Sequence, residues 1–183
     1  MNIWTRRTFL VGVGSTLAAC GNGIGNSRGQ KINYRVDLAL QQMYSEVPGS
    51  RDLADRAAGM LVMPTITKVG FGWGGAYGEG ALVIGGAPVE YYSVAKGTYG
   101  FQFGLQQYAH TLFFMNDAAL ADFRASSGWQ VGADVEYVVK NKGDNVGIDT
   151  TKLRSPVVAL IYGRAGLIVG ATLEGTKYSR IIR

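Results

Sequence analysis

The sequence predicts an α+β protein with a glycine-rich, largely antiparallel sheet, strongly coiled or closed into a small barrel, and a few packed helices. Three observations lead to this prediction. Glycine makes up 27 of the 183 residues, about twice its usual share, and lies among apolar and aromatic residues. Apolar residues make up 47% of the chain, enough for one core. Charged residues make up only 17%, which argues against a disordered chain or a coiled coil.

Residues 1–19 are predicted to be a signal peptide rather than part of the fold. Arg6 and Arg7 precede a short apolar run, and small residues lead to Cys20, the single cysteine of the chain. Residues 17–20, Leu-Ala-Ala-Cys, fit a bacterial lipobox, so Cys20 is the predicted lipidation site. The arginine pair resembles a twin-arginine export signal, and a general secretory signal is the alternative.

Export and acylation together predict a lipoprotein anchored to a membrane on the periplasmic side. Gly21 stands where an aspartate would favour retention in the inner membrane, so the outer membrane is favoured. Loss of the two signal-peptide arginines lowers the formal charge from +5 to +3. This mild excess suits attraction to anionic lipid headgroups and is too small to indicate nucleic-acid binding. Residues 20–30 are predicted to be a flexible tether before a domain at 31–183.

The first two helices are predicted near the start of this domain. Apolar residues recur at helical spacing over 31–46, with Tyr34, Leu38 and Met43 among them. A proline and a glycine then end the run. Ser50 is expected to cap a second, shorter helix.

A third helix is predicted over 116–126. Asn116 is its expected cap, because an asparagine side chain can accept a hydrogen bond from the first turn. Ala119, Leu120 and Phe123 recur at helical spacing and form its expected buried stripe.

Alternation with a period of two predicts the strands. Residues 60–64 indicate a strand that Pro64 ends, residues 99–106 alternate aromatic residues with glycine and glutamine, and residues 129–140 indicate one further strand. Two apolar runs near the end flank residues 163–166, which are predicted to form a hairpin turn.

The stretch around Gly70, Gly72 and Gly75 matches the G-x-G-x-x-G pattern of a dinucleotide-binding turn. Such a turn needs a helix that begins at the third glycine, and the glycine-rich residues after Gly75 prevent one. Phe71 and Trp73 alternate with the glycines instead. A strand with bare backbone on one face can coil tightly or admit another backbone closely, so the glycines are interpreted as architectural.

No catalytic or metal site is predicted, and no cofactor is expected. His110 is the single histidine and is expected to be hydrogen-bonded within the sheet. No serine lies in a G-x-S-x-G pattern. Asp134 and Glu136 indicate a solvated charged face rather than metal ligands. Glu79, between two glycines, is expected to accept hydrogen bonds from turn amides, with a functional role as the alternative.

Five glycine-rich and aromatic blocks follow one another along the chain, at residues 60–86, 91–106, 112–124, 128–139 and 155–179. Together they resemble, in order, the blocks of the SYLF domain family over about residues 36–181. The resemblance implies a compact α+β domain that binds phospholipids, with phosphoinositides preferred in eukaryotic members. Some of those members also bind and bundle actin filaments.

A lipid site needs cations for phosphate groups and apolar groups for acyl chains. Phe71 and Trp73 are the predicted apolar contacts. Lys96 departs from the family pattern, in which a small residue is usual, and both a headgroup contact and a solvated charge fit it. The predicted headgroup-binding cations lie beside aromatic strands or in the closing block: Lys68, Lys96, Lys177 and Arg180.

The predicted function is that of a non-catalytic periplasmic lipoprotein that binds phospholipid, phosphoinositide-like or otherwise anionic, or another amphiphilic ligand. The alternative is a structural or interaction protein that binds an envelope protein or peptidoglycan. Actin is a partner only by family analogy, and nucleic acid is not expected.

Overall fold

The computed structural model describes residues 27–71, 73–99, 104–132, 135–139, 148, 154–165, 173 and 175–183. The predicted signal peptide, the lipobox and Cys20 lie outside this range, as does Asp134. The helices are α1 (Ser27–Glu46), α2 (Ser50–Arg56) and α3 (Asp117–Ala125). The strands are β1 (Gly59–Phe71), β2 (Trp73–Ile84), β3 (Ala87–Tyr99), β4 (Gly104–Phe114), β5 (Trp129–Gln130), β6 (Val135–Val139), β7 (Val157–Ala165) and β8 (Lys177–Ile181).

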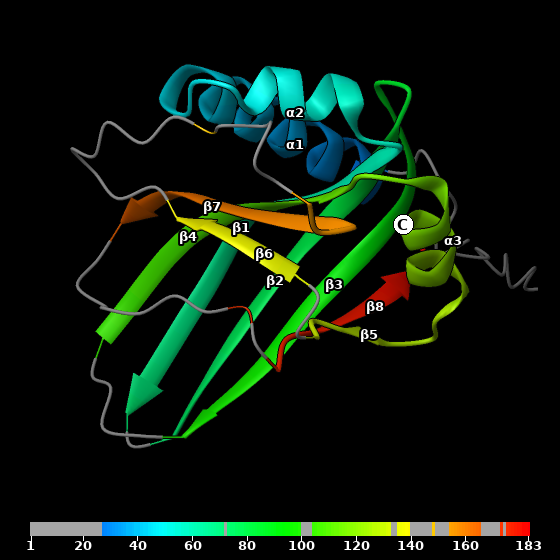
Figure 1. Ribbon diagram of the computed structural model, residues 1–183. Helices are drawn as coiled ribbons and strands as arrows, with labels where there is room; N and C mark the ends of the chain where they lie inside the picture. Colours follow the sequence, from blue (N-terminus) through cyan, green and yellow to red (C-terminus); the bar gives the residue numbers. More distant parts are fainter. Residues whose placement is uncertain are drawn as a thin grey trace, which may run out of the picture.

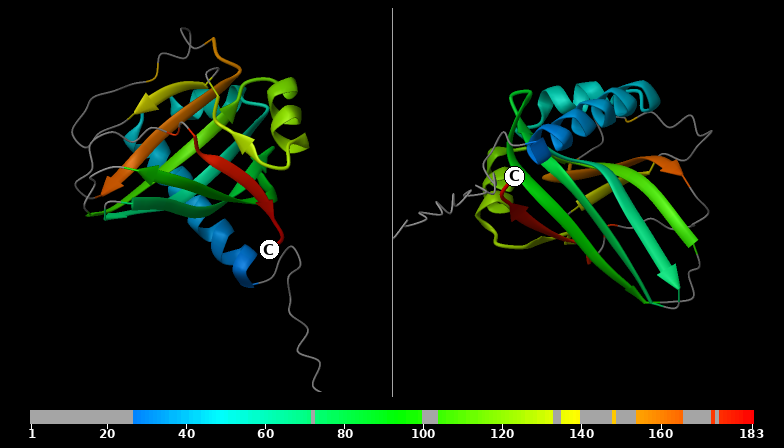
Figure 2. Two further views of the ribbon diagram at one scale, coloured as in Figure 1. Left: turned by 90° about the horizontal axis from the view of Figure 1, so that it is seen from below. Right: turned by 180° about the vertical axis from the view of Figure 1, so that it is seen from behind.

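The described strands form one strongly curled sheet (Figures 1 and 2), in the order β5-β8-β3-β2-β1-β4-β7-β6. Neighbouring strands are antiparallel except for the parallel pair β6 and β7. The two edge strands, β5 and β6, are joined by residues 131–134 alone. Such a link spans at most about 18 Å, so the curl brings the edges of the sheet near each other. The predicted α+β fold with a largely antiparallel, coiled sheet is confirmed.

Each face of the sheet has its own core. Helix α1 lies across the convex face (Figure 1), where Val36 and Met43 are buried with residues such as Phe113. The concave face holds the second core, and α3 contributes Leu120 and Phe123 to it. The apolar stripe of α3 is therefore confirmed, and so is its cap, because Asn116 Oδ1 accepts a hydrogen bond from the Ala119 amide at 2.9 Å.

Close backbone approach accounts for two glycines of β2. Strand β1 bulges between Val62 and Ile66, so its backbone presses against β2. A Cβ atom on Gly80 would collide with the Val62 carbonyl oxygen, and one on Gly78 would lie 2.5 Å from the Thr65 carbonyl oxygen. The close approach that the glycine-rich stretch predicts is found at these two positions. Gly75, the third glycine of the nucleotide-like pattern, lies in β2 and begins no helix.

Four strand predictions need correction. The alternating run 99–106 is not one strand, because Tyr99 ends β3 and Gly104 begins β4, with β2 and β1 between them in the sheet. Residues 100–103 lie outside the described residues.

Pro64 does not end β1. The strand continues through Pro64, which lies in a bulge, where the missing N–H group of proline interrupts no hydrogen bond between strands. The run 129–140 is not one strand, because β5 pairs with β8 and β6 pairs with β7 at the opposite edge. The expected hairpin turn at 163–166 is wrong in its first part, since β7 extends to Ala165 with Gly163 at a positive φ of 60°. Residues 166–172 lie outside the described residues.

The first helix differs from its prediction in extent and in its buried face. Helix α1 begins at Ser27, so the last residues of the predicted tether are helical. Tyr34 and Leu38 are exposed, whereas Ile32, Val36 and Met43 are buried. The apolar spacing identified the helix correctly but could not choose between its two apolar stripes.

Ser50 does not cap α2. The residue before the helix is Gly49, which has a positive φ of 87° and makes no side-chain capping bond. Ser50 is buried, and its hydroxyl donates a hydrogen bond to the Met43 carbonyl oxygen at 3.3 Å. The hydroxyl thus ties α2 to α1 instead of closing the helix end.

Candidate functional site

A row of side chains on the concave face contains two of the predicted cations. Gln106, Lys68, Ala76 and Lys96 are cross-strand partners in β4, β1, β2 and β3. We call these four residues the lysine row. Directly opposed residues share a face of the sheet, and Ala76 belongs to the concave core. The Cα atoms of Lys68 and Lys96 are therefore two strand spacings apart, about 10 Å, with only a methyl group between them.

Lys68 is an unusual cation because it is nearly buried. Its side chain is 9% exposed, and burial lowers the pKa of its ammonium group. Within the described residues Lys68 makes no hydrogen bond or ion pair. Partial removal of an ammonium group from water disfavours its charged form. An anion bound at the lysine row would offset that cost.

The other two predicted cations do not join the lysine row. Lys177 and Arg180 are three residues apart in β8, and alternation along the strand puts them on opposite faces. Lys177 pairs with Ala95, on the convex side. Arg180 pairs with Tyr92, whose ring lies in the concave core. The structure therefore brings together only two of the four predicted cations, Lys68 and Lys96.

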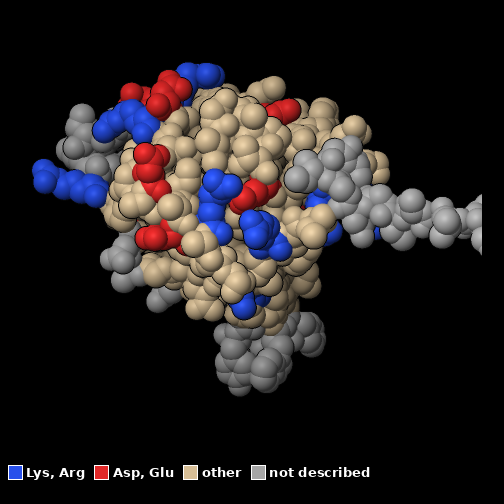
Figure 3. Space-filling model, turned by 90° about the vertical axis from the view of Figure 1, so that its right-hand side faces the viewer, with Lys and Arg blue, Asp and Glu red and all other residues tan. Residues whose placement is uncertain are grey.

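Arg180 is already engaged with a carboxylate. Its guanidinium lies 3.5 Å from Glu90 Oε1, which also accepts a hydrogen bond from Arg124 at 2.8 Å. The Tyr92 hydroxyl donates to the other oxygen of Glu90 at 2.7 Å. Burial opposes ionisation of Glu90, but these hydrogen bonds hold its pKa below the usual value. Figure 3 shows cationic and anionic side chains next to one another on this side of the molecule. The surface there is therefore not uniformly positive.

The predicted apolar contacts lie at the far end of the sheet from α2. The backbones of Phe71 and Trp73 pair with each other in β1 and β2, but their side chains lie outside the described part of the structure. Their described neighbours Val69 and Leu105 are cross-strand partners, 55% and 58% exposed. We call Val69 and Leu105 the outer pair.

The outer pair lies on the convex face, where α1 does not cover it. The convex core ends on β4 at Ala109, and Leu105 lies four residues farther along. The outer pair is one residue step, about 3.3 Å, nearer the sheet end than Lys68. Sequence reasoning missed these two residues, although both belong to the alternating apolar runs that predicted the strands.

Glu79 differs from its prediction. It lies inside β2 rather than in a turn, and its carboxylate accepts hydrogen bonds from Arg183 Nη2 at 2.6 Å and from the Tyr77 hydroxyl at 2.8 Å. The hydrogen bond from Arg183 is the main reason why the pKa of Glu79 is lowered. Glu79 thus fixes the C-terminal residues against the sheet.

His110 lies inside the concave core, completely buried. Its Nε2 atom is 2.7 Å from the Tyr178 hydroxyl, which confirms the expected hydrogen bond within the sheet. Burial lowers the pKa of His110 to about 3, so the ring is neutral at physiological pH. Among the described residues the His110 ring has no acidic or basic partner besides Tyr178, and a general base needs access to substrate.

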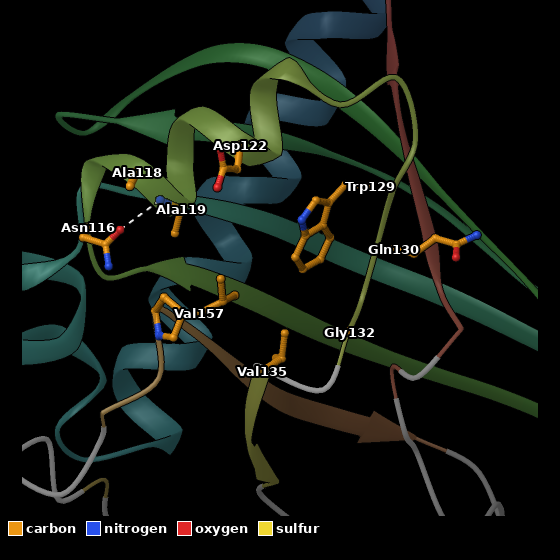
Figure 4. Close-up of a pocket in the computed structure, with 10 residues that line it drawn as sticks. Asn116, Ala118, Ala119, Asp122, Trp129, Gln130, Gly132, Val135 and Val157 are labelled. Carbon is orange, nitrogen blue, oxygen red and sulfur yellow. Dashed lines mark hydrogen bonds between the residues drawn. The ribbon is translucent and has the colours of Figure 1, made fainter.

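A pocket of about 440 Å³ opens beneath α3, where the two edges of the sheet approach each other (Figure 4). Asp122 and Asn116 line it from the α3 side, Trp129 from β5, and Val135 and Val157 from β6 and β7. Asp122 is the only charged residue in its described lining. The pocket therefore has the wrong charge for an anionic headgroup.

The described residues contain no group of three or more His, Cys, Asp or Glu side chains placed to hold a metal ion. None of the helices in the described ranges combines the length and apolar character needed to cross a bilayer.

Comparison with protein families gives a match over the second half of the chain. Residues 95–180 match the family model Ysc84, described as "Las17-binding protein actin regulator". No curated protein gives a significant match to the chain. The matched segment runs from β3 to β8 and includes Lys96, Lys177 and Arg180, whereas Lys68 precedes it. It covers just under half of the chain. The match confirms the predicted resemblance to the SYLF family over residues 95–180, the part of the chain that the Ysc84, or SYLF, model covers.

Proposed function

We propose that this protein is a non-catalytic phospholipid-binding lipoprotein, anchored through Cys20 on the periplasmic side of a membrane, with the outer membrane favoured. The observation that carries the proposal is the position of Lys68, a buried cation with no anionic partner among the described residues, one residue step from the exposed outer pair. Lys68 and Lys96 contact lipid phosphate, and Val69 and Leu105 contact the apolar layer beneath it.

The geometry supports contact between the end of the sheet and a bilayer surface. The outer pair lies nearer the sheet end than the lysine row. If the end of the sheet enters the leaflet first, the outer pair reaches the acyl chains while the lysine row stays at the depth of the phosphates. Long lysine side chains can place their ammonium groups at phosphate depth while their stems lie along apolar surface.

Flotation with liposomes tests the lysine row. The protein used is the chain from residue 20 with Cys20→Ser, which leaves α1 and all later elements intact. It is expected to bind phosphatidylglycerol-containing vesicles more strongly than neutral ones, and to lose this binding at high salt. Lys68→Met is expected to weaken the binding about fivefold, the effect of about 1 kcal/mol per lysine near an anionic surface.

The matched control is Lys31→Met, because Lys31 is an exposed cation on α1 and its loss changes the net charge equally. Lys68→Met should also keep or raise the thermal midpoint, since it removes an unpaired buried charge. Equal vesicle binding by the two variants, or salt-independent binding by the parent protein, contradicts the proposal.

The outer pair is tested separately. Val69→Asp places a charge in the surface that should enter the bilayer, and vesicle binding is expected to fall at least fivefold, since a charge there costs about 1 kcal/mol or more. Val89→Asp is the matched control, because Val89 is an exposed valine near the opposite end of the sheet. If both variants bind alike, the sheet end does not contact the membrane.

A structural or interaction role with a partner other than lipid is the second candidate function. The matched family is described as binding Las17 and regulating actin, and an exposed apolar pair also suits a protein interface. The partner here would be an envelope protein or peptidoglycan, with actin a family analogy only. A stoichiometric protein in pull-downs from envelope extracts, lost in Val69→Asp and free of co-purified phospholipid, would favour this alternative.

A further inference from the structure

We infer that the pocket beneath α3 is a binding site for a methylated ammonium group. The pocket lies at the gap between β5 and β6, on elements other than those that carry the outer pair. Its volume of about 440 Å³ is within the range of small-molecule sites, about 300–1,000 Å³. The inference does not depend on the proposed anionic-lipid function.

The charge of the pocket selects a cation. Asp122 extends from α3 into the same space as the Trp129 indole (Figure 4). Arg124, two residues along the helix, is held by Glu90 at 2.8 Å and does not line the pocket. The Asp122 carboxylate makes no ion pair or hydrogen bond with another described residue, so it is available to a ligand.

The tryptophan provides a second element of cation recognition. The Trp129 ring packs against Phe123 and Phe114 with interplanar angles of 73° and 77°. These contacts, together with Tyr178 at 5.8 Å between ring centroids, fix the indole in place. An indole face attracts cations more strongly than any other side-chain ring, and quaternary ammonium groups are recognised in this way.

The remaining walls favour methyl groups over N–H donors. The pocket lining includes Ala118, Pro156, Val135 and Val157, which offer apolar contact. Asn116 Oδ1 already accepts a hydrogen bond from the Ala119 amide, which leaves Gln130 as the other neutral polar side chain of the described lining. A primary ammonium group brings three donors that need acceptors, whereas a trimethylammonium group needs only apolar contact and a nearby negative charge. The site therefore fits a choline-type group better than an ethanolamine-type group.

The test uses NMR of the chain from residue 20 with Cys20→Ser and follows the indole N–H resonance of Trp129. This resonance is assigned by its absence from the spectrum of Trp129→Phe. Choline should shift this resonance saturably, ethanolamine more weakly, and the neutral isostere 3,3-dimethylbutanol should not shift it. Asp122→Asn should weaken choline binding about five- to tenfold. Asp37→Asn, which removes an exposed carboxylate from α1, should leave it unchanged.

Two further arms identify the source of the group. If Asp122→Asn also loses flotation on phosphatidylcholine vesicles, the ligand is a lipid headgroup. If Asp122→Asn weakens the binding of free choline but leaves flotation unchanged, the ligand is a soluble ammonium compound. Either result supports the site. The inference is overturned if choline gives no saturable shift up to about 100 mM, if the neutral isostere binds equally, or if Asp122→Asn binds choline like the parent. Failure of the anionic-lipid proposal would appear instead in the Lys68→Met comparison.

Discussion

At the scale of single residues, the environment of His110 makes a prediction about acid stability. The native ring cannot take up a proton until about pH 3, because it is buried, whereas an unfolded histidine does so near pH 6.5. The unfolded state therefore binds more protons between these values. Stability is complete above pH 6.5 and falls as the pH drops towards 3, by about 2 kcal/mol between pH 7 and pH 5.

Urea unfolding at several pH values measures this effect. His110 is the single histidine, and carboxylates titrate mainly below pH 5, so the window from pH 7 to pH 5 reports on it. His110→Gln should flatten the dependence of unfolding free energy on pH there, whatever its effect on absolute stability. In the parent protein the His110 ring signal should not titrate in NMR spectra above about pH 4. A ring that titrates near pH 6.5 would contradict its burial.

Lys68 illustrates what residue-level reasoning could and could not predict. Its position beside an aromatic strand was visible in the sequence, and so was the cap at Asn116, which needs only local contacts. The burial of Lys68 and its alignment with Lys96 depend on the register of β1, β2 and β3. Register is set by pairing between residues distant in the chain, which no local pattern contains.

At the scale of elements, the bulge in β1 and the glycines of β2 form one unit. Gly80→Ala is expected to destabilise the fold by about 1–3 kcal/mol, because the new methyl group would overlap the backbone of β1 at Val62. Gly97→Ala is the matched control in the neighbouring strand, since a Cβ atom there has no neighbour within 4 Å. Urea unfolding of the two variants measures the difference. Equal stability would show that β1 can move away from β2.

Local sequence patterns could not predict where each strand stops or which residues each element buries. Alternation correctly indicated β-structure within residues 99–106 and 129–140, but neither run is a single strand. In the second run the pattern continues past the end of β5 because Val131 is buried although it lies outside the strand. Helical spacing predicted α1, yet α1 has an exposed apolar stripe at Tyr34 and Leu38. Both errors arise because tertiary contacts, and not the pattern itself, decide which residues an element buries. The pocket beneath α3 was invisible for the same reason, since three separate segments form it.

At the scale of the whole molecule, the C-terminal strand completes the concave core. Tyr178 of β8 contacts both His110 and Trp129. Truncation after Thr176 is expected to abolish a single cooperative unfolding transition and to expose apolar surface to a dye such as ANS. Truncation after Ile181 keeps β8 and should retain cooperative unfolding. Calorimetry and dye binding distinguish the two, and cooperative unfolding of the shorter form would show that β8 is dispensable.

The place of β8 in the sheet makes folding depend on contacts between distant parts of the chain. Arg183 contacts Glu79, a residue 104 positions earlier in the chain, and β8 itself pairs with β3. Until residues 177–183 have joined the sheet, the concave core lacks one wall and β3 has an unpaired edge. Such edges recruit other strands. Late docking of β8 therefore leaves the chain open to aggregation, and a chaperone that covers the edge of β3 until then would protect its yield.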